Sequence, residues 1–283
     1  MAGQAVSICI YGYFWARMCW HISSIPFFMR RYLLIFVFLL VSPPYVWGFD
    51  VSPISAELDV SKQRSHLLTI TSKDKEQKPI RVKAVKWQLT KTGQDIRQET
   101  SDLILFPRQF VLSPNEKRVV RVGARTTTKP EIEKSYRILI QEVPVALEDR
   151  HGTESGVRLI TSYATAFYIA PQKPHSDIQL KSVERAADGL MFKLFNNGNA
   201  HSHLYDLALA FSQDGKTVHI NTDKQLQHFR NENLLAKNER DFSWHWPKDV
   251  TNPIDLTRPF NIELTFNCEF CDRAISALTY AVP

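Results

Sequence analysis

The sequence predicts an all-β protein that consists of two β-sandwich domains with an interdomain cleft, and three observations support this fold class. Short apolar segments, separated by turn residues about every ten positions, fill residues 50–171 and again residues 178–281. Neither half contains an apolar stripe of helical period and convincing length. Between the halves, Pro171-Gln172-Lys173-Pro174 interrupts the pattern and forms a short, stiff connector, since each proline fixes its own φ angle. We therefore expect domains at residues 49–171 and 172–283.

The strands that this pattern predicts are similar in number in the two domains. In the first domain they are an irregular edge at Ile54–Val60, then Ser65–Thr71, Ile80–Thr90, Asp102–Phe106, Arg118–Gly123, Ser135–Val143 and Val157–Ile169. In the second domain they are Ile178–Glu184, Leu190–Asn196, Leu204–Ser212, Lys216–Ile220, Glu239–Trp244, Phe260–Asn267 and Ala274–Ala281. About seven strands at this spacing are typical of a sandwich. Asp188-Gly189 and Asp214-Gly215 suit the left-handed backbone of hairpin turns.

The predicted strand Val157–Ile169 differs from the others because both of its faces carry apolar side chains. Successive side chains of a strand point to opposite faces, so residues 157, 159, 161, 163, 165, 167 and 169 form one row and the residues between them form the other. A half-solvated strand would alternate more cleanly. This strand is therefore either buried on both sides or an edge that offers an apolar row to a partner.

Residues 1–48 are interpreted as a leader. Arg30 and Arg31, the apolar run Leu33–Val41 and the small residue Gly48 have the order of a secretory signal that is cut before Phe49. The apolar run is too short to span a bilayer, so we expect no membrane insertion of the mature chain. Met29 is an alternative start to Met1. The sequence therefore predicts export, with the mature chain in the periplasm.

Composition argues for a globular protein that does not bind nucleic acid. Apolar residues make up 44% and charged residues 23% of the 283 positions. The formal charge of +6 includes three arginines of the leader and no acidic residue there, so the mature chain has a charge of +3. This bias is too weak to indicate a nucleic-acid partner.

Cys268 and Cys271 are the two cysteines that remain after Cys9 and Cys19 leave with the leader. In a flat strand, residues three apart lie about 10 Å from each other, which is too far for a disulfide, so a bond requires a turn. A structural disulfide in a hairpin or bulge is the favoured interpretation; a reduced pair and a redox or metal site are the alternatives. A redox motif normally begins a helix, which the pattern does not predict here.

Four motifs of the chain, taken in order, resemble the periplasmic chaperones of the chaperone–usher pilus pathway. They are Phe106-Pro107-Arg108-Gln109-Phe110-Val111-Leu112-Ser113-Pro114 with Val119-Val120-Arg121-Val122, then Ser135-Tyr136-Arg137-Ile138-Leu139-Ile140-Gln141-Glu142-Val143-Pro144, then the strand that ends in Phe167-Tyr168, and Phe195-Asn196-Asn197-Gly198-Asn199-Ala200-His201. The last of these is similar to an Asn-x-Gly-Asn turn of the archaic branch. The resemblance implies immunoglobulin-like sandwiches and no cofactor.

The resemblance also implies a function and partners. Pilin-type subunits are sandwiches that lack their last strand, and the family chaperone lends its own strand to the gap until an outer-membrane usher receives the subunit. The residues that match the family's donor row are Val157, Leu159, Thr161 and Tyr163. We expect this chain to bind and fold pilin subunits in the same way and to deliver them to an usher.

The family's charged anchor for the subunit's C-terminal carboxylate is missing, since Ser55 and Ala166 occupy the matching positions. An arginine can bind a carboxylate with two hydrogen bonds, so the neighbouring arginines are the candidate replacements. They are Arg137, Arg121, Arg158 and Arg81, of which Arg137 is favoured because its strand should pair with the donor strand.

Other candidate sites are weak. His201 and His203 share a strand face, but a polar edge is a better interpretation than a metal site, so we expect no metal. Nucleophile-elbow, zinc-protease and phosphate-loop motifs are missing, which indicates that the chain is not an enzyme. Two rival functions stay open at this point: an exported structural or adhesive sandwich protein, and a thiol oxidoreductase that uses Cys268 and Cys271.

Overall fold

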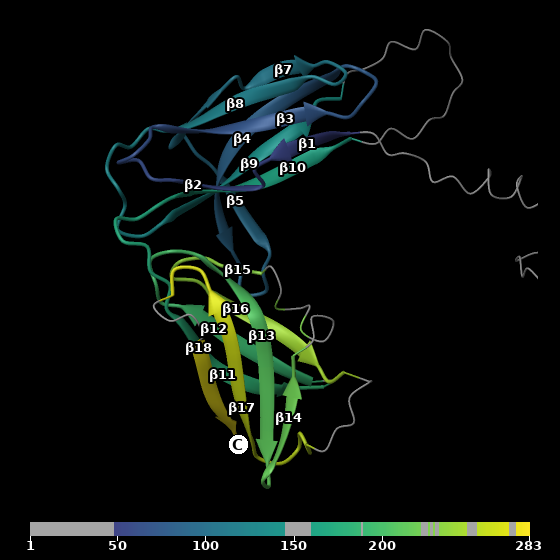
Figure 1. Cartoon of the computed structure of the whole chain (residues 1–283), viewed down its shortest axis with the longest axis vertical. Helices are drawn as coiled ribbons and strands as arrows, with labels where there is room; N and C mark the ends of the chain where they lie inside the picture. The colour runs from purple at the N-terminus through teal and green to yellow at the C-terminus, as the bar shows by residue number, and fades with distance from the viewer. Residues whose placement is uncertain are drawn as a thin grey trace, which may run out of the picture. The chain divides into compact units, whose positions relative to one another are not determined.

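The computed structural model of the chain describes residues 48–144, 160–187, 189–221, 226, 229, 232–247, 254–271 and 276–283. The leader expected at residues 1–48 lies outside this part except for Gly48, and so do Val157, Arg158 and Leu159. Figure 1 shows strands β1 to β10 in purple to teal and strands β11 to β18 in green to yellow. The protein is all-β throughout the residues listed above, as the sequence predicts.

The first sandwich is built from ten strands in two sheets. They are β1 (Phe49–Ser52), β2 (Ser55–Leu58), β3 (Ser65–Ser72), β4 (Lys78–Leu89), β5 (Asp95–Glu99), β6 (Leu103–Phe106), β7 (Gln109–Leu112), β8 (Lys117–Ala124), β9 (Lys134–Glu142) and β10 (Ser162–Ile169). One sheet has the order β1-β3-β8-β6, and the other has the order β2-β10-β9-β4-β5, with β7 also paired to β4. Their facing rows, among them Ile70, Val122 and Ile138, form one fully buried core.

The second sandwich contains the remaining strands. They are β11 (Ile178–Ala186), β12 (Gly189–Asn196), β13 (Ser202–Gln213), β14 (Lys216–Ile220), β15 (Asn233–Leu234), β16 (Glu239–His245), β17 (Phe260–Cys268) and β18 (Ser276–Val282). The sheet β11-β12-β16 packs on the sheet β14-β13-β17-β18. The core between them is rich in aromatic rings, with Phe211 stacked on Trp244 and Phe229 stacked on Phe242.

A third, small cluster of buried residues connects the two sandwiches. Trp87 and Leu89 of β4 and Tyr168 of β10 bury their side chains together with Leu235 of the second sandwich. The burial pattern of β4 explains how one strand serves two cores. Ile80 and Val82 face the first core, whereas Trp87 and Leu89 point to the opposite face of the sheet. Gly48–Pro283 consequently form one compact unit.

Four strands were not predicted from the sequence. β5 consists of five exposed residues and shows no apolar alternation, and β15 is only two residues long. β1 and β7 have four residues each, too few for a clear period. Each of them adds to a sheet that longer strands establish, and none changes the fold class.

The strand expected at Val157–Ile169 begins later than predicted. Ile160 and Thr161 are not in a strand, and β10 starts at Ser162. The two halves of the strand differ, and the apolar row for a partner stays a prediction. Residues 165–169 are buried on both faces between β2 and β9, while the first half of β10 has a free edge. Within the described ranges, no helix is long and apolar enough to cross a membrane.

Candidate functional site

The open edge of β10 is the first part of the candidate site. β9 pairs with β10 along its whole length, from Ser162 to Ile169, whereas β2 pairs only with Ala166–Ile169. Ser162–Thr165 therefore have no neighbouring strand on the side away from β9 in the part of the chain that the structure describes. The N–H of Ala166 donates to the carbonyl of Ile54 on that side, 3.1 Å away. Because the backbone alternates, the amides of Ser162 and Ala164 point in the same direction, where no strand of the described residues pairs with them.

The predicted donor row is only partly inside the described residues. Val157 and Leu159 lie outside them, and Thr161 precedes β10. Glu142 of β9 donates its N–H to the carbonyl of Thr161 over 3.1 Å, so the chain already runs beside β9 there. The ring of Tyr163 lies 5.1 Å from that of Phe49 at the border of the first core. The structure thus brings Thr161 and Tyr163 to the open edge.

Arg137 lies in one transverse row with Ser55 and Ala166, the two positions that the resemblance matches to a carboxylate anchor. Ala166 of β10 pairs with Ser55 of β2 on one side and with Arg137 of β9 on the other. The Arg137 guanidinium carbon lies 3.5 Å from the centre of the Trp87 ring, and its Nη2 lies 3.8 Å from Asp95 Oδ1. Burial lowers the pKa of Arg137, although an arginine stays charged. Its buried Nε has no hydrogen-bond partner, so part of the guanidinium is unsatisfied.

The other three arginines do not join this row. Arg81 is exposed on β4, opposite Gln141 and Gln109. Arg121 is exposed on β8, which belongs to the other sheet of the first sandwich. Arg158 lies outside the described residues. The geometry therefore places Arg137, but neither Arg81 nor Arg121, beside Ser55 and Ala166.

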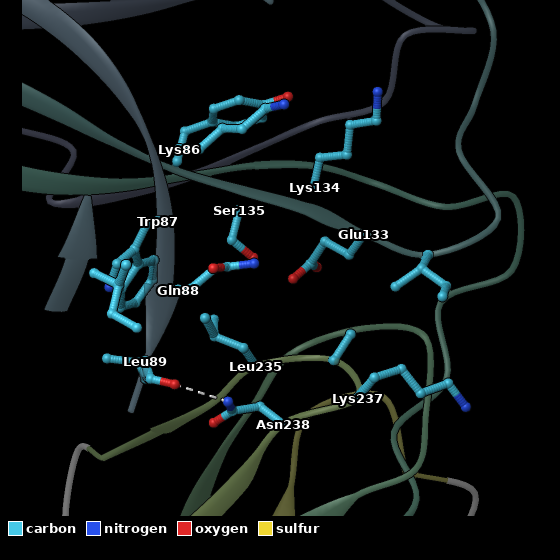
Figure 2. A pocket seen from close by; sticks show the side chains of 14 residues that line it. Lys86, Trp87, Gln88, Leu89, Glu133, Lys134, Ser135, Leu235, Lys237 and Asn238 are labelled. Carbon is cyan, nitrogen blue, oxygen red and sulfur yellow. Dashed lines mark hydrogen bonds between the residues drawn. The ribbon is translucent and has the colours of Figure 1, made fainter. Parts of the chain in front are cut away.

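A pocket of about 550 Å³ lies next to this row, between β4 and β9 of the first sandwich and the segment before β16 of the second (Figure 2). Trp87 and Leu89 contribute apolar surface from one side and Leu235 from the other. The dashed line in Figure 2 joins Asn238 Nδ2 to the Leu89 carbonyl, 3.0 Å apart, which ties the two sandwiches at this point. The pocket is the interdomain cleft that the sequence predicts.

The pocket also contains lysine side chains that no motif of the sequence points to. Lys86, Lys134 and Lys237 all line it. Lys86 Nζ lies 3.6 Å from Asp102, and Lys237 donates to the backbone carbonyl of Asn197. No local pattern could have identified them, because they come from two sandwiches and meet only through the fold.

A polar cluster at the contact between the sandwiches surrounds His201. Its ring stacks on that of Tyr168 with the centres 3.7 Å apart, and its Nδ1 lies 2.7 Å from Glu133 Oε2. The backbone N–H of His201 donates to Glu133 Oε1 over 3.2 Å. Glu133 and His201 are both buried. The Glu133 carboxylate of the first sandwich accepts from the backbone N–H and the ring of His201, and so it holds the turn before β13 in place.

His203 and Glu269 extend this cluster toward solvent. His203 Nδ1 lies 3.0 Å from Glu269 Oε2, and the Tyr205 hydroxyl donates to Glu269 Oε1 over 2.6 Å. The hydrogen bond from His203 lowers the pKa of Glu269 to about 2, against the opposing effect of burial. Burial and the charge of Glu133 raise the pKa of Glu57, which lies opposite Tyr168 on β2. The cluster is therefore acidic, with two imidazoles among its carboxylates.

A disulfide between Cys268 and Cys271 closes the turn that carries Glu269, with the two Cα atoms 5.7 Å apart. Phe270 in this turn has a φ of 58°, the left-handed conformation that brings the cysteines together. The Phe270 carbonyl accepts a hydrogen bond from the N–H of Ser176, 2.8 Å away. The disulfide thus fixes a tight turn against the connector between the sandwiches.

Comparison with known proteins gives a family match for the first sandwich. Residues 58–174 match the family described as pili and flagellar-assembly chaperone, PapD N-terminal domain. A search of curated proteins gives no significant match.

Among solved structures, the class 5 fimbriae chaperone CfaA is 19% identical over 83% of this chain and 100% of its own, with a TM-score of 0.51. A chain of the chaperone–tip adhesin complex of CFA/I fimbriae is 18% identical over 82% of this chain and 98% of its own, with a TM-score of 0.51. A chain of the CsuC–CsuE chaperone–tip subunit complex, from archaic Csu pili of Acinetobacter baumannii, is 16% identical over 82% of this chain and 98% of its own. Its TM-score is 0.52. At these identities the likeness establishes the fold of two immunoglobulin-like sandwiches.

The match is to assembly chaperones and supports neither of the two rival functions, the thiol oxidoreductase and the adhesive sandwich protein. Residues 58–174 therefore belong to the PapD N-terminal domain family of pili and flagellar-assembly chaperones.

Proposed function

We propose that this chain binds and folds pilin-type subunits by donor-strand complementation in the periplasm and delivers them to an outer-membrane usher. The observation that carries the proposal is the edge of β10 at Ser162–Thr165, which no strand covers on the side away from β9 among the described residues. An uncovered edge of this kind pairs readily with a strand of another chain. Chaperone–pilin complementation is an established form of such strand addition.

The chemistry of the edge fits a subunit that lacks one strand. The outward N–H and C=O groups of Ser162 and Ala164 would pair with the subunit backbone, and this contact supplies affinity without sequence preference. Val157, Leu159, Thr161 and Tyr163 would supply the alternating row that fills the subunit's groove. Each large side chain that becomes well buried contributes about 1.5–3 kcal/mol. The two complexes with tip subunits among the similar structures support a pilin-type partner.

A proline on the open edge tests the proposal directly. Ala164 is exposed, and its N–H points away from β9, so Ala164→Pro removes an outward donor and leaves the β9 ladder intact. Ala164→Val is the matched control, because valine favours strands and keeps the N–H. After co-expression with a pilin subunit, we expect Ala164→Pro to lose most of the recovered complex and Ala164→Val to retain it.

Two further measurements separate binding from folding in this experiment. The melting temperature of each variant is measured without a subunit. A loss of complex is attributed to binding only where this temperature stays near that of the parent protein. Leu159→Asp places a charge in the proposed row and should also abolish the complex. Wild-type recovery by both Ala164→Pro and Leu159→Asp would contradict donor-strand complementation through β10.

Arg137 is the proposed anchor for the subunit's C-terminal carboxylate. It shares a row with Ser55 and Ala166, and its Nε has no hydrogen-bond partner. Desolvating an unpaired carboxylate is costly, so a cation at this place would stabilise the bound terminus. Asp95 and Trp87 hold the guanidinium on the face of the sheet that lies beside the pocket.

The anchor is tested with Arg137→Gln, compared with Arg81→Gln and Arg121→Gln. Glutamine removes the charge and keeps an amide donor on a shorter side chain, and the same change at the two control positions accounts for the loss of length. We expect Arg137→Gln to reduce the complex recovered with a wild-type subunit and to have no effect with a subunit whose C-terminal carboxylate is amidated. The Arg81 and Arg121 variants should behave like the parent protein. Equal affinity of the parent and Arg137→Gln proteins for the wild-type subunit would eliminate Arg137 as the anchor.

A further inference from the structure

Three side chains at the contact between the sandwiches converge in the way that metal ligands do. His201, His203 and Glu269 each have one nitrogen or oxygen ligand atom, and these atoms lie within 4.8 Å of one another. His201 Nε2 is 3.7 Å and His203 Nδ1 is 3.0 Å from Glu269 Oε2. Ligand atoms around a tetrahedral zinc ion, at about 2.0–2.1 Å from the metal, are separated by about 3.3 Å. The two separations that involve Glu269 are close to that value, and the two histidine nitrogens lie within 4.8 Å of each other.

The fold, and not a flexible surface, sets this spacing. His201 precedes β13 and His203 lies on it two residues later, so their side chains share one face of the strand. β13 pairs with β17 in a register that places Leu204 opposite Cys268. Glu269 follows directly in the turn that the disulfide closes. The histidines and the carboxylate therefore come from two paired strands whose register is fixed.

Each of the three side chains also has the supporting hydrogen bond that metal ligands usually have. A hydrogen bond from Nδ1–H of His201 to Glu133 Oε2, over 2.7 Å, leaves the Nε2 lone pair free. The Tyr205 hydroxyl donates to Glu269 Oε1 and leaves Oε2 for an ion. His203 Nε2 lies 3.2 Å from the side-chain amide of Asn233.

The amide of Asn233 bears on which nitrogen of His203 carries the proton. Its Oδ1 is buried without a hydrogen-bond partner, whereas its Nδ2 lies near His203 Nε2 and the Tyr168 hydroxyl. Turned by 180°, the same amide would present Oδ1 to two donors, Nε2–H of His203 and the Tyr168 hydroxyl. That arrangement protonates Nε2 and frees the Nδ1 lone pair of His203 for a metal. One buried atom of the Asn233 amide lacks a partner in either orientation, so the amide allows this tautomer of His203 but does not require it.

We propose that His201, His203 and Glu269 bind a single Zn²⁺ ion, with water as the fourth ligand. Two imidazoles and one carboxylate suit zinc, whereas Ca²⁺ and Mg²⁺ prefer oxygen ligands. The ion would also offset the negative charge of Glu57, Glu133 and Glu269, which face this region together. All three ligands belong to the second sandwich, so the ion would fix the ring of His201 in the place where Glu133 and Tyr168 of the first sandwich contact it. The proposal does not depend on donor-strand complementation.

The test uses the protein purified from the periplasm, with a tag that contains no histidine and after treatment with EDTA. Calorimetric titration with Zn²⁺ alone should show one ion per chain, and Mg²⁺ should not compete. His203→Gln and Glu269→Gln each remove one ligand, while His219→Gln removes an exposed histidine of β14 and is the matched control. Glu133→Gln keeps the ligands and weakens only the support of His201, so we expect it to cost 10–100-fold in affinity.

We expect a larger loss with His203→Gln and Glu269→Gln than with Glu133→Gln, and no change with His219→Gln. Melting in EDTA shows which variants are folded. Should the ligand variants fail to fold, Co²⁺ added to the unaltered protein serves as the probe, because a four-coordinate ion absorbs visible light far more strongly than a six-coordinate one. A weak, water-like Co²⁺ spectrum would overturn the proposal. Zn²⁺ binding of unchanged affinity in folded His203→Gln and Glu269→Gln proteins would overturn it as well.

Discussion

At the scale of single residues, the hydroxyl of Tyr136 connects the first core to its rim. The ring is fully buried, and the hydroxyl donates to Asp102 Oδ2 over 2.9 Å. Tyr136→Phe keeps the ring and removes a hydrogen bond to a charged acceptor, so we expect a loss of about 1.5–3 kcal/mol in the free energy of unfolding. Urea unfolding at neutral pH measures it. Tyr280→Phe, which alters a partly buried ring of the second sandwich, should cost less than about 0.5 kcal/mol.

The same pair predicts a pH dependence. Burial alone would raise the pKa of Asp102, but the Tyr136 hydroxyl and the charges of Lys86 and Lys134 outweigh it and lower the pKa. A depressed carboxyl pKa stabilises the fold above the unfolded value of about 3.9, and this stabilisation disappears as the pH falls through the folded value. The difference between parent and Tyr136→Phe proteins should therefore be full at neutral pH and smaller near about pH 2. A difference that is equal at both pH values would contradict this.

Contacts between a residue of one sandwich and a residue of the other could not be predicted from the sequence, whereas neighbours within one sheet could. Arg137 was favoured because its strand should pair with the donor strand, and the β9–β10 register places it opposite Ala166. The contact between Glu133 and His201 is not predictable from the sequence, since 68 positions separate the two residues and no period relates a loop to a distant turn. The polar edge expected at His201 and His203 stays a prediction, with the zinc site as its rival.

At the scale of elements, the turn Asn196-Asn197-Gly198-Asn199 depends on a missing side chain. A Cβ on Gly198 would lie 2.2 Å from the His175 carbonyl and 2.6 Å from Ser176 Cα, both of them backbone atoms of the connector. Gly215 has a φ of +77° but open space around it. Gly215→Ala should cost about 1 kcal/mol of strain, and Gly198→Ala more, toward about 3 kcal/mol, because backbone must move. Urea unfolding of the two variants compares them; equal losses would exclude the clash.

The long strands show why the fold class was predictable and some elements were not. β8 and β9 carry alternating buried rows that specify their register, and the expected ranges lie within one residue of the observed ends. β5 has exposed residues along its whole length and forms only because β4 extends past the sandwich and offers it an edge. An element that tertiary contacts create leaves no pattern of its own in the sequence.

At the scale of the whole molecule, the leader and the cysteines are tested by one mass measurement on protein from the periplasm. Removal of residues 1–48 takes Cys9 and Cys19 away and leaves Cys268 and Cys271. We expect the mass of a chain that begins at Phe49. We also expect no alkylated thiol without reductant and two alkylated thiols after reduction. Four alkylated thiols, or a mass that includes the leader, would contradict the cut, and alkylation without reductant would contradict the disulfide.

The central claim is that the first half of β10 is a free edge that a subunit covers, and amide hydrogen exchange tests it most directly. The N–H of Ala164 points away from β9 with no partner strand in the described chain, whereas the N–H of Ala166, two residues on, already donates to Ile54. In the free protein Ala164 should exchange fast and Ala166 slowly. When a pilin subunit is bound, Ala164 should become as protected as Ala166. Fast exchange of Ala164 in a stable complex would contradict the account.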